Sequence, residues 1–245
     1  MRWLCSAVIF FVPQAVGAAA EPLCEKLKYE GDLYSVCRVD LREVQLEVFN
    51  LDRDGQPLRN FSALAKLAAE DGKELRFAMN AGMFDESLKP IGLYVEEGEQ
   101  KKKLNRRDGS GNFHLKPNGV FYVKGDRLGV VATEAYAKMN LEPDFATQSG
   151  PMLVIEGEIH PKFSETGTSF KRRNGVGMVG DHTAVFAISE NAVNFYDFAI
   201  FFRDGLNCAN ALFLDGSVSS LYSPELGRND QFLPLGPMVG AVELR

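Results

Sequence analysis

Ala211-Leu-Phe-Leu-Asp-Gly-Ser-Val-Ser-Ser-Leu-Tyr222 is the stretch from which the fold and a candidate site follow most directly. Its four leading apolar residues predict a short buried strand that ends at Asp215-Gly216. We expect Gly216 to let the backbone turn with a positive φ, next to a group of serine hydroxyls. A carboxylate at the end of a buried strand can present a reactive group at a cleft, but an Asp-Gly turn can also simply cap its own backbone. Other stretches decide between these two interpretations.

On both sides of this stretch the chain alternates between short apolar runs and turn residues, which is typical of β-hairpins. Two helices are also predicted. One covers residues 63–70, with Ser62 as its cap, and the other begins at Asn194 and carries an apolar stripe at helical spacing. Hairpins far outnumber helices. The sequence therefore predicts an α+β fold, a single domain of hairpin-rich mixed β-sheets with two or three packed helices.

The N-terminus has the pattern of a secretory signal peptide. Arg2 precedes an apolar run that is too short to span a membrane comfortably, and small residues follow at positions 16–20. We therefore divide the chain into a signal peptide at 1–20 and a domain at 21–245, and expect a periplasmic or secreted bacterial protein. An uncleaved anchor is the alternative. After cleavage we expect no transmembrane anchor.

The charge of the chain argues against nucleic acid as a partner. The formal net charge is −6, and it becomes −7 when Arg2, the only charged residue among the first twenty, is removed with the signal peptide. Binding to a phosphate backbone calls for a basic surface. The expected partner is therefore not a nucleic acid.

The cysteines and histidines show no pattern of catalytic or metal-binding residues, and we expect structural roles for the cysteines. Export makes disulfides possible, and a bond between Cys24 and Cys37 would tie down the N-terminal segment. Cys208 precedes an apolar strand, so we expect a buried, inert thiol. Histidines occur only at 114, 160 and 182, without the spacing of a zinc site, and we expect them at the surface.

Four stretches of small residues, each ending a predicted strand and each with one kind of polar group, point to a common site. They are Asn80-Ala-Gly82, Ser149-Gly150-Pro151, Arg172-Arg173-Asn174-Gly-Val-Gly177 and Asp215-Gly-Ser-Val-Ser219. Guanidinium groups bind phosphate bidentately and stay charged. Taken together, the four stretches predict an anion-binding pocket that contains one carboxylate.

In this order and at these separations, the stretches resemble the phosphodiester glycosidase family, which includes the N-acetylglucosamine-1-phosphodiester alpha-N-acetylglucosaminidase. The matching segments are 80–84, 149–154, 173–177 and 213–219. The resemblance covers about residues 30–245. It implies a hydrolase that cleaves the glycosidic bond of a sugar 1-phosphodiester and releases sugar and a phosphomonoester. The partner that it implies is a small-molecule or envelope-glycan phosphodiester substrate.

The chain departs from the family pattern at several positions, which is typical of a divergent bacterial branch. Ala81 replaces a glycine, Asn174-Gly175 replaces Thr-Ala, and Ser217-Val218 replaces two glycines. We expect a narrower pocket near Ser217 and a substrate that differs from that of the mammalian enzyme.

Carried over residue by residue, the resemblance implies a role for each polar group. Asp215 is the expected base or nucleophile at the anomeric carbon, Arg173 holds the phosphate, and Asn80 completes the catalytic set. Asp85 is a weaker candidate for a second carboxylate. The expected substrate-binding residues are Gly82, Phe84, Ser149, Gly150, Arg172, Gly216, Ser217 and Ser219.

Two other functions remain open at this point. The same pocket could belong to a non-catalytic periplasmic module that binds a phosphosugar or an envelope glycan. Alternatively, Asp215, Asp85 and Asn80 could hold Mg²⁺ or Ca²⁺ in a metal-dependent phosphodiesterase. The favoured interpretation requires no cofactor and no metal.

Overall fold

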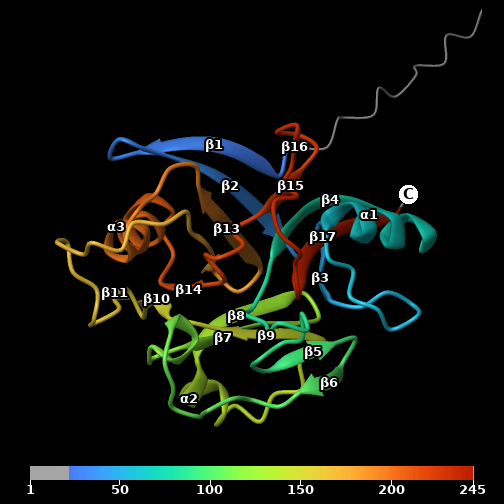
Figure 1. Cartoon of the computed structure of the whole chain (residues 1–245), viewed down its shortest axis with the longest axis horizontal. Coiled ribbons are helices and arrows are strands. Elements are labelled where there is room, and N and C mark those ends of the chain that lie inside the picture. The colour runs from blue at the N-terminus through green and yellow to red at the C-terminus, as the bar shows by residue number, and fades with distance from the viewer. Residues whose placement is uncertain (1–21, 245) are drawn as a thin grey trace, which may run out of the picture.

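The computed structural model describes residues 22–244. Three antiparallel sheets account for most of this part of the chain, and Figure 1 shows them arranged around a common centre. The first sheet has seven strands in the order β1 (Cys24–Tyr29), β2 (Asp32–Asp40), β13 (Thr183–Ser189), β12 (Asn174–Val179), β14 (Asn210–Phe213), β10 (Met152–Ile155) and β11 (Glu158–Ile159).

The other two sheets have five strands each. The second runs in the order β16 (Arg228–Asn229), β15 (Leu221–Ser223), β4 (Lys73–Asn80), β17 (Met238–Leu244) and β3 (Gln45–Phe49). The third runs β6 (Glu99–Lys102), β5 (Tyr94–Glu96), β9 (Phe145–Ser149), β7 (Gly119–Lys124) and β8 (Arg127–Ala132). The hairpin pairs β7–β8 and β12–β13 follow the alternation expected from the sequence.

Few helices accompany the sheets, so the predicted α+β class is confirmed. They are α1 (Phe61–Glu70), α2 (Thr133–Tyr136), α3 (Phe195–Ile200), the 3₁₀ turn η1 (Asn112–His114) and the π-helical turn η2 (Phe201–Gly205). In Figure 1, α1 lies over the second sheet and α3 beside the first. The start predicted for α1 was wrong: Asn60 is the cap, and its side chain accepts a hydrogen bond from the Ala63 amide. Asparagine caps helices as well as serine does, so the capping signal at Ser62 was ambiguous.

One phenylalanine from each sheet meets the others at the centre of the molecule. The ring of Phe186 in β13 lies 4.9 Å from that of Phe77 in β4 and 5.9 Å from that of Phe121 in β7, measured between centroids. All three side chains are almost fully buried. Because the three sheets share this one core, the sheet ends that carry the polar stretches are held in fixed relative positions.

The described cysteines behave as predicted. Cys24 and Cys37 form a disulfide that ties β1 to β2, and Cys208 is buried as a free thiol whose pKa burial raises to about 12. The predicted signal peptide at 1–20 lies outside the described residues. Within residues 22–244, no helix has both the length and the apolar character needed to cross a bilayer.

The surface location expected for the histidines was wrong for His160. Its side chain is only 1% exposed and stacks on Phe163, and burial lowers its pKa to about 4. It directly follows β11, and Phe163, on which its ring stacks, stacks in turn on Phe195 of α3. His114 and His182 are partly exposed.

Candidate active site

The four small-residue stretches meet at the turn that follows β14. Asn80 ends β4, and its Nδ2 donates a 3.0 Å hydrogen bond to the backbone carbonyl of Asp215. Ser149 ends β9, and its Oγ donates to the carbonyl of Leu214 at 2.6 Å. The Leu214 amide in turn donates to the carbonyl of Asn174, the first residue of β12. Three strand ends therefore hold the turn in place.

A buried amide network lies directly beneath this turn. Oδ1 of Asn80 accepts hydrogen bonds from Nδ2 of Asn174 at 3.0 Å and from the backbone amide of Ser220 at 2.9 Å. Oδ1 of Asn174 accepts from Oγ of Ser219 at 3.2 Å. Satisfied buried networks of this kind make the local structure rigid and specific. Asn80 and Ser149 thus direct their hydrogen bonds to the backbone of the turn, where they position Asp215.

Asp215 stands at the edge of this network and is partly exposed. Burial raises the pKa of its carboxyl group, while the amide and hydroxyl of Ser217 lower it; the amide donates to Oδ1 at 3.0 Å. Within residues 22–244, no basic side chain forms an ion pair with this carboxylate. A carboxyl group of raised pKa at a fixed position is suited to exchanging a proton with a substrate or with water.

A small hollow opens against the turn, with a volume of about 160 Å³. Its lining includes four of the residues that the sequence predicted would bind substrate, namely Arg172, Gly216, Ser217 and Ser219. Val218 and Ser220 complete that wall. The hollow is therefore lined by Arg172, by serine residues and by the turn; Asp215 is not among its lining residues, but it directly precedes Gly216, which is.

The opposite wall of the hollow is apolar and was not anticipated from the sequence. It consists of Phe232 and Leu233, which are 75% and 52% exposed. An adjacent Phe-Leu pair directly after the polar segment 228–231 is an available signal. Its exposure, however, could not be read from the sequence, because apolar pairs are usually buried.

Arg172 lines the hollow, and hydrogen bonds to Glu190 and Ser189 fix its side chain. Its Nη2 donates to Oε2 of Glu190 at 3.0 Å, and its Nε donates to the carbonyl of Ser189 at 3.1 Å. Glu190 also accepts from Nη1 of Arg228 at 2.5 Å. Burial alone would raise the pKa of Glu190, but Ser35 and the two arginines together lower it by more. The net shift is downward, so the carboxylate is ionised at neutral pH. Glu190, which the sequence did not single out, thus orients the guanidinium of Arg172.

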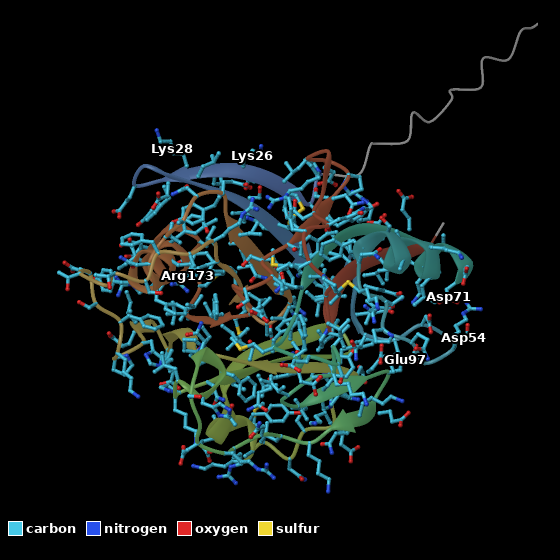
Figure 2. All side chains as sticks on the ribbon, viewed as in Figure 1. Lys26, Lys28, Asp54, Asp71, Glu97 and Arg173 are labelled. Atoms are coloured by element: carbon cyan, nitrogen blue, oxygen red, sulfur yellow. A yellow bond between two sulfur atoms is a disulfide. The ribbon has the colours of Figure 1, made fainter. Side chains whose placement is uncertain are left out.

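Arg173 points the other way, into the molecule. Its guanidinium lies 3.6 Å from the ring centre of Phe195, and Figure 2 shows it beside α3. Nε donates to the carbonyl of Val193 at 2.9 Å, and Nη2 donates to that of Ser169 at 2.6 Å. Burial lowers its pKa to about 10, so it stays charged at neutral pH. Arg173 is not among the residues that line the hollow; it ties segment 161–171 to the core.

Gly82 and Gly150 allow close packing between strands. A Cβ on Gly82 would lie 2.5 Å from the carbonyl oxygen of Gln148, and one on Gly150 would lie 2.6 Å from Cβ of Asn118. Both distances are shorter than real contacts. Gly82 therefore lets the chain after β4 pass close to β9, and Gly150 lets the chain after β9 pass close to segment 112–118.

The positive φ expected at Gly216 was wrong, because its backbone lies outside the left-handed region. A Cβ there would lie 2.7 Å from the Phe213 ring and 3.3 Å from the carbonyl oxygen of Arg172. Close approach of the turn to Arg172 is the reason for glycine at this position. Phe84 is half-buried and packs against Gly236, where even a Cβ would collide with its ring.

Asp85, the weaker candidate for a second carboxylate, is exposed and serves its own loop. Its Oδ1 accepts hydrogen bonds from the backbone amides of Ser87 at 2.9 Å and Lys89 at 3.1 Å. Asp215 is therefore the carboxylate that the geometry favours. Asn80 is not free to bind a substrate or a metal, because both polar atoms of its side chain bond within the protein.

Comparison with known proteins shows the family of the chain and its fold. The profile of the phosphodiester glycosidase family matches residues 73–232. The uncharacterized protein YigE of Escherichia coli strain K12 is 48% identical over 149 residues, which are 61% of this chain and 58% of that protein. The match therefore spans little more than half of that relative's length.

Solved structures with the same fold include the catalytic domain of zebrafish N-acetylglucosamine-1-phosphodiester alpha-N-acetylglucosaminidase, auto-inhibited by its pro-peptide. It is 15% identical, with a TM-score of 0.61 over 91% of this chain and 84% of that chain. A putative exported protein from Burkholderia pseudomallei is 9% identical, with a TM-score of 0.55 over 86% of this chain and 74% of that one. At such identities the likeness shows the fold. Since the family profile covers well over half of the chain, this protein belongs to the phosphodiester glycosidase family.

Proposed function

We propose that this protein is an exported hydrolase that cleaves the glycosidic bond of a sugar 1-phosphodiester. The observation that carries the proposal is the Asp215 carboxylate, which has a raised pKa and belongs to a turn fixed by a buried network; the following residues of that turn line a hollow together with Arg172. Family membership supports the same reaction class. Export is supported by the Cys24–Cys37 disulfide, because disulfides persist mainly outside the reducing cytosol.

The proposed chemistry needs little acid assistance, because a phosphate is a good leaving group. Asp215 acts at the anomeric carbon, either as the nucleophile or as the base that takes a proton from the attacking water. The water oxygen ends on the sugar, and the electron pair of the broken carbon–oxygen bond goes to the phosphate oxygen. A raised pKa makes the carboxylate a stronger base.

In this scheme Arg172 is the cation that faces the phosphate, since it lines the hollow and Arg173 does not. The turn backbone and the hydroxyls of Ser217 and Ser219 provide further donors for the charge that develops on the leaving group. Three residues do not contact the substrate in this scheme. Arg173 holds segment 161–171, whereas Asn80 and Ser149 position Asp215 through its turn.

The altered glycines favour one alternative, a module that binds a phosphosugar without turning it over. Ser217 and Val218 stand where the family resemblance has two glycines. The hollow, at about 160 Å³, is also smaller than the usual range of ligand sites, about 300–1,000 Å³.

The direct test is release of free sugar from UDP-N-acetylglucosamine, or from a related sugar 1-phosphodiester, by the mature protein. It is run with and without chelator, beside Asp215→Asn and the matched control Asp85→Asn. We expect release that persists in chelator and in the control but is lost in Asp215→Asn. Binding without release across several sugars would favour the binding module, and loss of activity in chelator would favour a metal-dependent phosphodiesterase.

A further inference from the structure

Four side chains of alternating charge form a chain of ion pairs that begins in the wall of the Asp215 hollow. Arg172 lines the hollow, and its Nη2 donates to Oε2 of Glu190 at 3.0 Å. The other oxygen of Glu190, Oε1, accepts from Nη1 of Arg228 at 2.5 Å. Nη2 of Arg228 then donates to Oδ2 of Asp230 at 2.7 Å. The order is cation, anion, cation, anion, so the formal charges of this ion-pair chain cancel.

The far end of the ion-pair chain is anchored to the backbone. The carboxylate of Asp230 accepts a hydrogen bond from the Leu221 amide at 3.0 Å, and the Asp230 amide donates to the Leu221 carbonyl at 3.0 Å. Leu221 directly follows Ser220, which lines the hollow. Both ends of the ion-pair chain are therefore tied to segments that line the hollow.

Exposure to solvent increases along the chain toward the hollow. The side chains of Arg228 and Asp230 are 12% and 11% exposed, whereas that of Arg172 is 34% exposed. Partly buried charges are screened by salt much less than exposed ones. The charge of Glu190, between the two arginines, therefore acts on any anion that binds at Arg172.

Arg172 keeps one guanidinium nitrogen for a ligand. Its Nε bonds to the Ser189 carbonyl and its Nη2 to Glu190, while Nη1 makes no hydrogen bond with any described residue. Of the described residues that line the hollow, Arg172 alone has a charged side chain, and Asp215 directly precedes the lining residue Gly216. A phosphate in the hollow thus meets one cation, whose charge a carboxylate already offsets, and a second carboxylate nearby.

Glycosidic hydrolysis raises the charge of the phosphate. A phosphodiester carries one negative charge. Water gives its hydroxyl to the sugar, the carbon–oxygen bond breaks toward the phosphate, and the proton of the water is released as the resulting monoester ionises. That monoester carries about −1.5 to −2 at pH 7, because its second pKa is about 6. Its second charge finds no cation of its own among the residues that line the hollow.

We propose that Glu190 and Arg228 make the hollow selective for the singly charged phosphate of a diester over the doubly charged phosphate of a monoester. Glu190 sets the preference because it offsets the charge of Arg172, and Arg228 is a positioning residue that holds Glu190. Hydrolysis then produces a phosphate that the site repels, which favours release of the product. The inference rests on the proposed function in that it takes the hollow as the phosphate site.

The large groove beside β5 provides a control for this proposal. It has a volume of about 950 Å³, its walls include β3, the end of α1 and the β5–β6 hairpin, and it shares no lining residue with the hollow. Burial raises the pKa of Glu96, one of its lining residues, to about 7. Glu47, also in the groove, is 12% exposed and pairs with Lys73 at 2.6 Å. Glu47→Gln therefore removes a partly buried carboxylate from an ion pair, as Glu190→Gln does, but away from the hollow.

The test is binding of methyl phenyl phosphate and phenyl phosphate to the mature protein at pH 8. Both ligands contain one phosphate and one ring, but they carry one and about two negative charges. Protein-observed NMR measures the affinities, and the Arg172 Nε and Ser217 amide signals report binding in the hollow. We expect the parent protein to bind the diester about three- to tenfold more tightly than the monoester.

The two variants of the ion-pair chain should change this preference in opposite directions. Glu190→Gln leaves the Nε bond of Arg172 in place and removes the offsetting charge, so the preference for the diester should disappear or reverse. Arg228→Gln removes a cation and should increase the preference about threefold, with weaker binding of both ligands. The control Glu47→Gln should change the ratio of affinities less than about twofold.

Opposite signs separate an electrostatic role from a structural one. Both variants break partly buried ion pairs and should lower the melting temperature, but a purely structural loss would change the preference in the same direction in both. Each variant tests the proposal by itself if the other fails to fold. The proposal is overturned if the parent protein shows no preference for the diester, if neither ligand binds in the hollow at millimolar concentration, or if Glu190→Gln keeps the parent preference.

Sugar release from UDP-N-acetylglucosamine, measured on the same proteins, separates this inference from the proposed function. The expected preferences without any sugar release would reject the hydrolase and leave the selectivity of the hollow standing. Sugar release by a parent protein that binds the monoester as tightly as the diester would leave the hydrolase standing and reject the role of Glu190 and Arg228.

Discussion

The hollow at the Asp215 turn and the large groove beside β5 differ in size, origin and chemistry. The hollow is about 160 Å³. A buried hydrogen-bond network that includes residues from three strand ends fixes the turn that lines it. The groove is about 950 Å³, and its rim is made of salt bridges between side chains that are largely exposed. Chemistry requires groups held in fixed positions, whereas binding requires surface. The smaller region is therefore the better candidate for catalysis.

The largest expected effect is on the rate of sugar release, when the carboxyl group of raised pKa in each region is replaced by an amide. Asp215→Asn is expected to lower the rate of sugar release by about 10²–10⁴-fold, the usual contribution of a catalytic acid or base. Glu96→Gln, in the groove, is expected to change the rate of sugar release less than about twofold, because it lies outside the catalytic hollow. Steady-state assays on a small soluble substrate measure both. Equal losses in the two variants would remove the distinction between the regions.

The next largest effect is expected beneath the turn. Asn80→Ala removes the side-chain hydrogen bonds to the Asp215 carbonyl, the Asn174 side-chain amide and the Ser220 amide, which should lower the free energy of unfolding by about 3 kcal/mol. Because the carboxylate then loses its fixed position, kcat should fall more than KM changes. Urea denaturation and steady-state kinetics measure these effects.

Asn229→Ala is the control for that variant, since the Asn229 side chain bonds to Ser62 at the surface. It should change neither the stability nor the rate. If Asn80→Ala reduced stability and left kcat intact, Asn80 would be structural only and would not position Asp215.

The two neighbouring arginines should separate stability from substrate binding. Arg173→Met removes bonds to the Val193 and Ser169 carbonyls, so we expect a loss of about 1–3 kcal/mol in the free energy of unfolding and faster trypsin cleavage at Lys162. Arg172→Met removes a partly exposed ion pair with Glu190, which contributes about 0–1 kcal/mol to stability, and one hydrogen bond to the Ser189 carbonyl, but it should raise KM for an anionic substrate. The reverse pattern, with KM controlled by Arg173, would return the phosphate-binding role to that residue.

The smallest expected effect is on the pH dependence of stability. The raised pKa of Asp215 means that the folded protein holds this proton more tightly than the unfolded chain does. Its contribution to stability is therefore complete below the ordinary aspartate pKa of 3.8 and is lost as pH rises through the folded value. Asp215→Asn stays neutral, so its stability relative to the parent protein should increase with pH from about pH 4 upward. Chemical denaturation at a series of pH values measures the difference, and a difference that shrinks with rising pH would contradict the shift.

Local patterns in the sequence predicted most of the fold. Period-two alternation marked the β7–β8 hairpin, and the apolar run before Asp215 marked β14. The cap of α1 was misplaced by two residues, since Asn60 and Ser62 are both good caps and tertiary contacts decide between them. The burial of His160 could not be read at all, because it depends on packing between segments distant in sequence.

For the site, the sequence predicted which stretches carry polar groups but not where each side chain points. Successive residues of an extended chain face opposite sides, so only one of Arg172 and Arg173 could face the hollow. The chain does not reveal which one, because the answer depends on the position of α3. The groove left no local signal, since its residues are spread from Glu47 to Lys102 and are brought together only by the fold.

The measurement that tests the central claim most directly is hydrolysis of a sugar 1-phosphodiester in water labelled with oxygen-18, followed by mass spectrometry of the phosphomonoester. If Asp215 directs attack at the anomeric carbon, the phosphomonoester keeps its original oxygens and carries no label, and Asp215→Asn forms no product. Label in the phosphomonoester would show attack at phosphorus and would contradict the assignment of this site as a glycosidase.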